Sequence, residues 1–313
     1  MNSNSKISRV SLMVSLAIVC TIAGNYIPLL GFMNIFVGSI FLVIGIIAGG
    51  FSSLILAILS YAVIAILLIG SIGAAGMVLG FALPGITMGY LMEKFDDDTA
   101  LFTGVIATAV GFLALLKLSE YVTGTGFFDI YEQSMNQSMN MMNEMGLNAN
   151  FPKDFSLAHM AEVVKYTFPT IMLLTSLITC LFFKHIGVFL YKKVAPNSTI
   201  KYRLFSDFVI PDKTGFMFAV LAIALYLLSY LNILDSAYVK RMLSNIFYIV
   251  LGLLGVQGFA VLISVVGMLK GIKKNFAIMG LIFLFAYIVV TMPVLGILDL
   301  FLDLRGKSFR SGK

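Results

Sequence analysis

An uncharged stretch of 83 residues, from Val10 to Met92, contains no Asp, Glu, Lys, Arg or His. A soluble fold keeps part of each element in water, so it does not leave so long a stretch without charge. A bilayer favours such a stretch, because a charged side chain at the centre of a spanning helix costs about 2.5–3.5 kcal/mol. One helix crosses the hydrocarbon layer in about 20 residues, so the stretch is long enough for about four crossings. The sequence therefore predicts an integral membrane protein.

The composition of the whole chain agrees with this prediction. Its 313 residues are 60% hydrophobic and 12% charged, whereas ordinary globular domains are about 25% charged. The net charge of +6 indicates basic loops that face anionic membrane lipids, and we expect no nucleic-acid partner. Cys20 and Cys180 both lie in apolar runs, so we expect buried free thiols rather than a disulfide.

Nine apolar segments follow one another along the chain, and they do not alternate with polar residues as barrel strands do. Their ranges are 9–27, 33–49, 51–70, 73–92, 100–119, 166–190, 215–234, 243–269 and 275–299. The predicted fold class is all-α, a polytopic transmembrane helical bundle of eight or nine spans. The count stays open because Pro293 and Gly296 interrupt the last segment.

The distribution of Lys and Arg predicts the orientation of the chain. With the N-terminus inside, twelve basic residues lie in inside loops and five in outside loops. Because Lys and Arg favour cytoplasmic loops, the N-terminus is predicted to be cytoplasmic. The four basic residues of the C-terminal tail would lie outside with nine spans and inside with eight.

The sizeable polar insertion at 120–165 is predicted to lie outside the membrane. Four of its methionines fall on one helix face, namely Met135, Met139, Met142 and Met145. Gly146 suits the end of this helix and Ser156 the start of a second one, so we expect an amphipathic hairpin over the bundle. Thioethers can bind Cu(I). Without Cys or His beside them, these methionines are better explained by contact with lipid or neighbouring helices.

Common catalytic motifs do not occur in the sequence. We find no phosphate loop G-x-x-x-x-G-K-[ST], no H-E-x-x-H and no G-x-S-x-G. His159 and His185 are isolated, with no partners at metal-ligand spacing. We therefore expect no enzyme activity, no bound metal and no other cofactor.

Small residues mark possible helix contacts. Two glycine pairs have the G-x-x-x-G spacing that lets backbones approach closely, Gly76 with Gly80 and Gly85 with Gly89. We expect them to pack within the bundle, with a partner interface as the alternative. Ser11 and Ser15 give the first segment a small-residue face on which another helix can dock.

A few polar side chains near the predicted outer edge of the membrane are candidates for substrate binding. They are Asn25, Tyr26, Asn34, Glu120 and Tyr121. A ligand pocket roofed by 120–165 could use them, and ordinary anchoring at the membrane interface is the alternative. Lys117, three residues before Glu120, can pair with it on one helix face.

Asp299 and Asp303 form a C-terminal acidic pair, because residues four apart share a face if the helix continues. Carboxylates at membrane depth can mark a path for protons or cations. The alternative is a solvated helix end, or one in which Arg305 pairs with a carboxylate. An intramembrane enzyme that uses these carboxylates is a third functional option.

Two parts of the chain resemble known membrane protein families. IFLVIGIIAGGFSSLILAILSYAV with GFALPGITMGYLMEK, within Ile40–Lys94, resembles the substrate-binding S components of energy-coupling factor (ECF) vitamin transporters. YRLFSDFVIPDKTGFMF (Tyr202–Phe218) with LGILDLFLDLRGK (Leu295–Lys307) is similar to the YybS-like family. That family consists of bacterial membrane proteins of unknown function, distantly related to S components. It often has a Trp before the loop that contains this proline, whereas the present chain has no Trp and offers Phe208.

The resemblance implies a division of the chain and a partner. The parts are an S-component-like six-helix transmembrane bundle at 1–192 with the external insertion 120–165, a cytoplasmic loop at 193–214, and C-terminal transmembrane helices with a basic tail at 215–313. It implies that Ser11 and Ser15 meet a transmembrane coupling subunit driven by separate ATPases. The outer polar groups would then border the ligand site.

These observations lead to two functional hypotheses. In the first, the protein binds and transports an unknown small molecule in the bacterial cytoplasmic (inner) membrane, with a partner that supplies energy. In the second, it is a structural or assembly protein of the cell envelope whose external hairpin docks another protein. Membrane lipids surround the chain in both.

Overall fold

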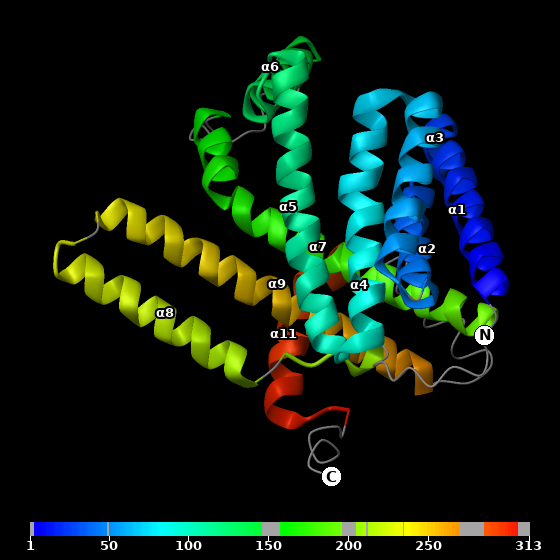
Figure 1. The fold of residues 1–313 in the computed structure, drawn as a ribbon. Coiled ribbons are helices and arrows are strands. Elements are labelled where there is room, and N and C mark those ends of the chain that lie inside the picture. Colours follow the sequence, from blue (N-terminus) through cyan, green and yellow to red (C-terminus); the bar gives the residue numbers. More distant parts are fainter. Residues whose placement is uncertain are drawn as a thin grey trace. The chain divides into compact units, whose positions relative to one another are not determined.

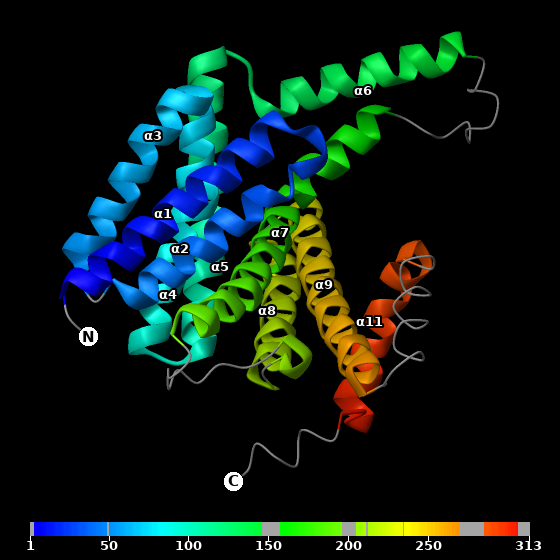
Figure 2. The same ribbon diagram turned by 90° about the vertical axis from the view of Figure 1, so that its right-hand side faces the viewer.

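The structure, a computed structural model, is built from α-helices (Figures 1 and 2). The residues it describes are 3–48, 50–145, 157–195, 205–210, 212–233, 235–268 and 285–305, and none of these forms a strand. The predicted all-α fold class is confirmed. The chain divides into two compact units, which comprise residues 1–168 with 175–200 and residues 169–174 with 201–313.

The first unit contains α1 to α6 and most of α7. Its elements are α1 (Ser3–Tyr26), η1 (Pro28–Leu30), α2 (Met33–Ile47), α3 (Phe51–Met77), the π-helical turn η2 (Val78–Ala82), α4 (Leu83–Lys94), α5 (Asp97–Thr123), α6 (Phe127–Glu144) and α7 (Leu157–Val194). Helices cover most of each apolar segment predicted up to residue 190, and α6 contains Met135, Met139 and Met142 of the insertion. Met145, predicted to share their face, follows the end of α6 and is 70% exposed. Gly146 and Ser156, the predicted ends of the hairpin helices, lie outside the described residues.

A glycine divides the longest helical run of this unit. Phe51–Lys94 comprises α3, η2 and α4 and is 44 residues long. Gly70 interrupts it with φ 77° and ψ 171°, a backbone conformation that glycine adopts without steric cost. Figure 1 shows the chain reversing direction within α3. The run therefore provides two helices of crossing length, as the break between the segments 51–70 and 73–92 predicts.

α2 lies at the centre of the first unit. All residues of Val37–Ile47 are buried, and α2 packs against both α1 and α4. A Cβ added at Gly89 would lie 2.0 Å from the carbonyl oxygen of Leu42, and one at Gly85 would lie 2.1 Å from that of Gly38. The backbones of α2 and α4 touch because no side chain separates them.

The other glycine pair faces a different helix. A Cβ at Gly80 would lie 3.0 Å from the ring of Phe112, and one at Gly76 would lie 3.5 Å from the side chain of Leu115. Both neighbours belong to α5. The two G-x-x-x-G pairs thus pack against two different helices of the same unit.

Asp96 fixes the start of α5. Its Oδ1 accepts a hydrogen bond from the Thr99 hydroxyl at 2.6 Å, and its Oδ2 accepts one from the Thr99 backbone N–H at 2.9 Å. These bonds satisfy a donor that the first turn of a helix leaves free. They also lower the pKa of Asp96, chiefly through the hydroxyl.

The second unit is built around two helices in close contact, α9 and α11. Its elements are η4 (Phe205–Asp207), α8 (Asp212–Tyr230), α9 (Ser236–Met268) and α11 (Phe285–Leu302). These helices cover most of the predicted segments 215–234 and 243–269, and α11 covers the second half of 275–299. Pro293 and Gly296 do not end the last segment, since both lie inside α11.

Apolar side chains lie on the outside as well as the inside. Leu67 is 80% exposed, Phe102 68% and Val19 60%. Five helical runs among the described residues are long and apolar enough to cross a membrane: Lys6–Tyr26, Phe51–Lys94, Asp97–Thr123, Glu162–Val194 and Ser236–Gly267. Phe51–Lys94 counts here as one run, although Gly70 divides it into two helices. Three shorter apolar helices accompany them, Met33–Ile47, Val220–Tyr230 and Thr291–Leu302. Lipid is the solvent that such a surface requires.

Candidate functional site

A buried ion pair in the second unit is the most distinctive polar feature of the structure. The side chains of Arg305 and Asp299 are only 1% and 4% exposed. Arg305 Nε donates hydrogen bonds to Asp299 Oδ1 at 3.2 Å and to Oδ2 at 3.1 Å, and Nη2 donates to Oδ2 at 2.5 Å. A guanidinium that engages both carboxylate oxygens forms a strong and directional contact.

Gln257 of α9 completes this contact from a second helix. Its side chain is fully buried. The amide nitrogen Nε2 donates to Asp299 Oδ2 at 2.9 Å, and the amide oxygen Oε1 accepts from the backbone N–H of Ile210 at 3.1 Å. One amide therefore connects α11 with the segment that precedes α8.

Arg305 holds the same segment through backbone carbonyl groups. Its Nη1 donates to the carbonyl oxygens of Ser206 at 2.7 Å and of Phe208 at 2.9 Å. The ring of Phe205 also packs edge-on against Phe259 of α9, with the ring centroids 6.0 Å apart. We call Gln257, Asp299 and Arg305 the polar clamp, because together they fix residues 205–210 to α9 and α11.

Glycines explain why the side chains of Gln257 and Asp299 can meet across α9 and α11. A Cβ added at Gly258 would lie 1.9 Å from the carbonyl oxygen of Met292, and one at Gly296 would lie 2.0 Å from that of Leu254. The backbones of α9 and α11 therefore touch beside the clamp. Gln257 is the immediate neighbour of Gly258, so its amide reaches Asp299 directly.

The turn that follows α11 brings the side chain of Arg305 back into contact with Asp299. The helix ends at Leu302, and Asp303 follows with φ 43° in the left-handed region. The Asp303 N–H still bonds to the Asp299 carbonyl oxygen at 2.9 Å. Asp303 has thus left the helical conformation, so the condition for a shared acidic face is not met. Arg305 instead pairs with Asp299, which is one of the two arrangements that the sequence left open.

The clamp is suited to positioning rather than to proton transfer. Its two charges neutralise each other, and Gln257 fills further hydrogen-bonding positions on Asp299 and Ile210. Removing one partner of such a buried pair leaves a charge without a counterion, which is strongly destabilising. Residues 205–210 are consequently held in one place on α9 and α11.

A second internal ion pair lies in the first unit. Lys184 of α7 contacts Asp97 at the start of α5, with side chains 11% and 10% exposed. The Asp97 carboxylate lies in the first turn of its helix, where a negative charge is favourable. This pair fixes the start of α5 to α7.

The predicted substrate-binding residues fall into separate groups. Asn25 Nδ2 donates to the Thr21 carbonyl oxygen at 2.8 Å and to Asn34 Oδ1 at 3.4 Å, so α1 and the start of α2 meet there. The Tyr26 hydroxyl donates to the Leu68 carbonyl oxygen of α3. These bonds link three helix ends around the first loop.

The other two predicted substrate-binding residues lie at the end of α5. Glu120 forms the expected pair with Lys117, with the nitrogen and oxygen 2.7 Å apart. Tyr121 is 88% exposed. The structure joins Glu120 to Lys117, and it joins Asn25 to Asn34, as two distinct contacts.

The small-residue face of α1 is accessible. Ser11 and Ser15 are both exposed, and the Ser15 hydroxyl donates to the Ser11 carbonyl oxygen at 3.1 Å. Ala17 and Thr21, on the opposite side of the helix, are buried. The Thr21 hydroxyl lies 2.6 Å from that of Tyr61 on α3. Ser11 and Ser15 therefore face away from the core.

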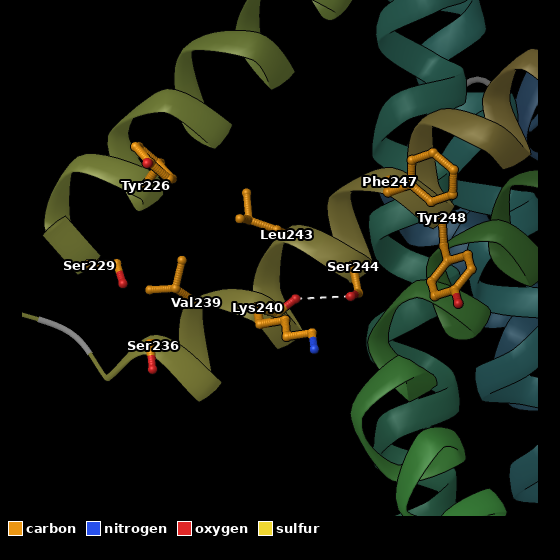
Figure 3. A pocket seen from close by; sticks show the side chains of 9 residues that line it. All are labelled: Tyr226, Ser229, Ser236, Val239, Lys240, Leu243, Ser244, Phe247 and Tyr248. Carbon is orange, nitrogen blue, oxygen red and sulfur yellow. Dashed lines mark hydrogen bonds between the residues drawn. The ribbon is translucent and has the colours of Figure 1, made fainter.

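A groove of about 430 Å³ lies between α8 and α9 near the turn that connects them. It is lined by Tyr226, Ser229, Ser236, Val239, Lys240, Leu243, Ser244, Phe247 and Tyr248. Figure 3 shows Val239 and Leu243 on the side of α9 that faces α8, and the Ser244 hydroxyl bonded to the Lys240 carbonyl oxygen. The predicted substrate-binding residues lie outside this groove. Among the described residues, no three His, Cys, Asp or Glu side chains gather as a metal site.

The apolar exterior, the crossing-length helices and the internal ion pairs define a multi-pass membrane protein. The chain belongs to the family described as "Predicted membrane protein (DUF2232)", whose sequence profile matches residues 15–300. Ser15, Gln257 and Asp299 fall inside the matched region, whereas Ser11 and Arg305 lie outside it. Comparison with curated proteins and with solved structures gave no match.

Proposed function

We propose that the protein binds a small solute in the bacterial cytoplasmic membrane and translocates it with a partner that supplies energy. The partner would be a transmembrane coupling subunit with separate ATPases, and the chain itself would carry out no catalysis. The N-terminus would be cytoplasmic, as the distribution of basic residues favours.

The observation that carries this proposal is the exposed face of α1. Ser11 and Ser15 point away from the core although small side chains favour close helix contacts. The Ser15 hydroxyl is bonded within its own helix, so this side chain presents no unsatisfied donor to a partner helix. Neighbouring Leu12 is 62% exposed and Val19 is 60% exposed, which adds apolar area for a partner.

The solute would be recognised near the first loop, where Asn25, Tyr26 and Asn34 gather. Amide and hydroxyl groups bind polar, uncharged parts of a ligand. On the same proposal, Glu120 and Tyr121 at the end of α5 would also contact the solute, beneath the insertion 120–165.

The test compares bulky substitutions on two exposed helix faces. The Ser11→Leu/Ser15→Leu variant is purified from native membranes beside Ser60→Leu, which changes an exposed serine of α3 whose hydroxyl is likewise bonded within its helix. Wild type and Ser60→Leu are expected to retain an ATPase-containing complex and solute uptake, and the double variant to lose both. If wild-type protein retains neither an ATPase partner nor a small molecule, the proposal is wrong.

A role in envelope assembly is the second candidate function. It is favoured by the exposed polar face of α6, which includes Asn136, Gln137 and Asn140. On this proposal, deletion of residues 127–150 abolishes capture of a specific envelope protein and leaves solute uptake unchanged. Loss of uptake without loss of a protein partner would favour transport instead.

A further inference from the structure

A very short connection joins α6 to the membrane-crossing helix α5. α5 ends at Thr123, Gly124 adopts φ 70°, and α6 begins at Phe127. Figure 2 shows α6 extending sideways from the end of α5 rather than continuing it. Three intervening residues reach at most about 10 Å, so α6 must begin close to the level at which α5 leaves the bilayer.

Contacts with α7 fix the first half of α6 at the same level. The rings of Phe127 and Phe128 both lie 5.3 Å from the ring of Phe168, centroid to centroid. Glu132 pairs with Lys165, with the nitrogen and oxygen 2.5 Å apart. Phe168 and Lys165 belong to the first two turns of the candidate span Glu162–Val194. The start of α6 is therefore held beside two helices where they reach the membrane surface.

One face of α6 is apolar and less exposed than the other. Its residues follow helical spacing and are half-buried, and we call them the Met stripe: Phe128, Tyr131, Met135, Met139 and Met142. The opposite face is exposed and mostly polar, and it includes Gln133, Ser134, Asn136, Gln137 and Asn140. A helix of this pattern places its apolar face in a less polar medium than water.

The charge of α6 determines which surface suits the Met stripe. Residues 127–144 contain three acidic side chains and no Lys or Arg. Helices that bind anionic lipids carry basic residues on the polar face, so attraction to anionic headgroups is excluded as the driving force. Burial of the apolar Met stripe in the lipid interface remains as the driving force. Flexible methionine side chains adapt well to such a fluid surface.

We propose that α6 is a membrane-surface helix whose Met stripe lies in the interface of electrically neutral lipids beside the bundle. The short connection to α5 keeps the stripe near the bilayer, so little translational entropy is lost when it inserts. Because no basic residue contributes, the contact is insensitive to salt and does not require anionic lipid.

The experiment measures where each face of α6 lies in the full-length protein. Cys20→Ala and Cys180→Ala remove the native thiols, and single cysteines with nitroxide labels replace Met135, Met139, Asn136 or Gln137. The samples are placed in phosphatidylcholine nanodiscs. Collision rates are recorded with oxygen, which concentrates in lipid, and with a water-soluble nickel complex.

The expected result is a severalfold higher oxygen-to-nickel collision ratio at positions 135 and 139 than at 136 and 137, unchanged in 0.5 M salt and after addition of anionic lipid. Equal access of nickel at all four positions would place the stripe in water and overturn the proposal. Exclusion of both reagents at 135 and 139 would show that protein covers the stripe, and would overturn it equally.

A second set of variants changes the stripe at positions other than the labelled one. A nitroxide at position 135 is combined with Met139→Gln/Met142→Gln, or with the control Met141→Gln, whose side chain is 58% exposed outside the stripe. The double substitution is expected to lower the oxygen-to-nickel ratio at position 135, and the control to leave it unchanged. An equal effect of both would contradict the assignment of the face.

Discussion

Arg305 engages both carboxylate oxygens of Asp299, a residue that lies six positions earlier on α11. The turn after Leu302, with Asp303 at φ 43°, is what returns the guanidinium to the helix. Because Arg305 also binds two carbonyl groups of 205–210, the end of α11 and the segment before α8 form one connected structure. The position of residues 205–210 thus depends on the ion pair of Asp299 and Arg305, which lies far away in the sequence.

Gln257→Leu is expected to release residues 205–210 from α9. The variant leaves the Ile210 N–H without its partner and removes one hydrogen bond to Asp299 Oδ2, which keeps its bonds from Arg305; the loss is about 1–3 kcal/mol. A single cysteine at Val209, which is 39% exposed, reports the change through its rate of thiol labelling in a Cys20→Ala/Cys180→Ala background. Faster labelling supports the clamp. An unchanged rate would mean that Gln257 does not hold the segment.

Gly258→Ala is expected to separate α9 from α11. The new Cβ would lie 1.9 Å from the Met292 carbonyl oxygen, which belongs to the backbone and cannot rotate away. Gly267→Ala is the matched control, because nothing lies within 4 Å of its Cβ and alanine favours a helix by about 1 kcal/mol over glycine. Thermal unfolding in detergent should show a lower midpoint for Gly258→Ala alone. Equal midpoints for both variants would refute the close approach.

Tyr61→Phe is expected to weaken the contact between α1 and α3. The Thr21 hydroxyl donates to the Ala17 carbonyl oxygen at 2.9 Å, so the Tyr61 hydroxyl is the donor in the 2.6 Å bond between them. Such bonds between membrane helices are worth about 0.6 kcal/mol on average. The free energy of unfolding should fall by about this amount, and Tyr121→Phe, which alters an exposed ring, should change it little. A larger loss from Tyr121→Phe would contradict this assignment.

The sequence predicts the helices well because uncharged runs and glycine breaks are local features. The run Phe51–Lys94 illustrates this, since its single reversal at Gly70 coincides with the predicted break. The pairing of Glu120 with Lys117 is also local, since the two residues lie three apart. Contacts of this kind follow from helix geometry alone.

The sequence did not reveal the polar clamp. The sequence indicates Asp299 and Arg305 as possible partners, but our interpretation of it does not include Gln257, which is the one amide side chain within 246–268. A polar group isolated in an apolar helix is a signal that it binds another polar group. Which group it binds depends on how α9 and α11 pack, and that depends on Gly258 and Gly296. Packing of distant segments is not encoded in a local pattern.

A double-mutant cycle tests the ion pair directly. Asp299→Asn, Arg305→Met and the double variant are compared by their free energies of unfolding in mixed detergent micelles. The exposed pair of Lys117 and Glu120, with side chains 79% and 45% exposed, serves as the control cycle.

Each single change at the clamp is expected to cost about 3–5 kcal/mol, since it leaves one buried charge unpaired. The double variant should lose clearly less than the sum of the two, while the control pair should give a coupling of about 0–1 kcal/mol. Additive losses at Asp299 and Arg305, or a coupling no larger than that of the exposed pair, would contradict the conclusion that this ion pair fixes residues 205–210 to α9 and α11.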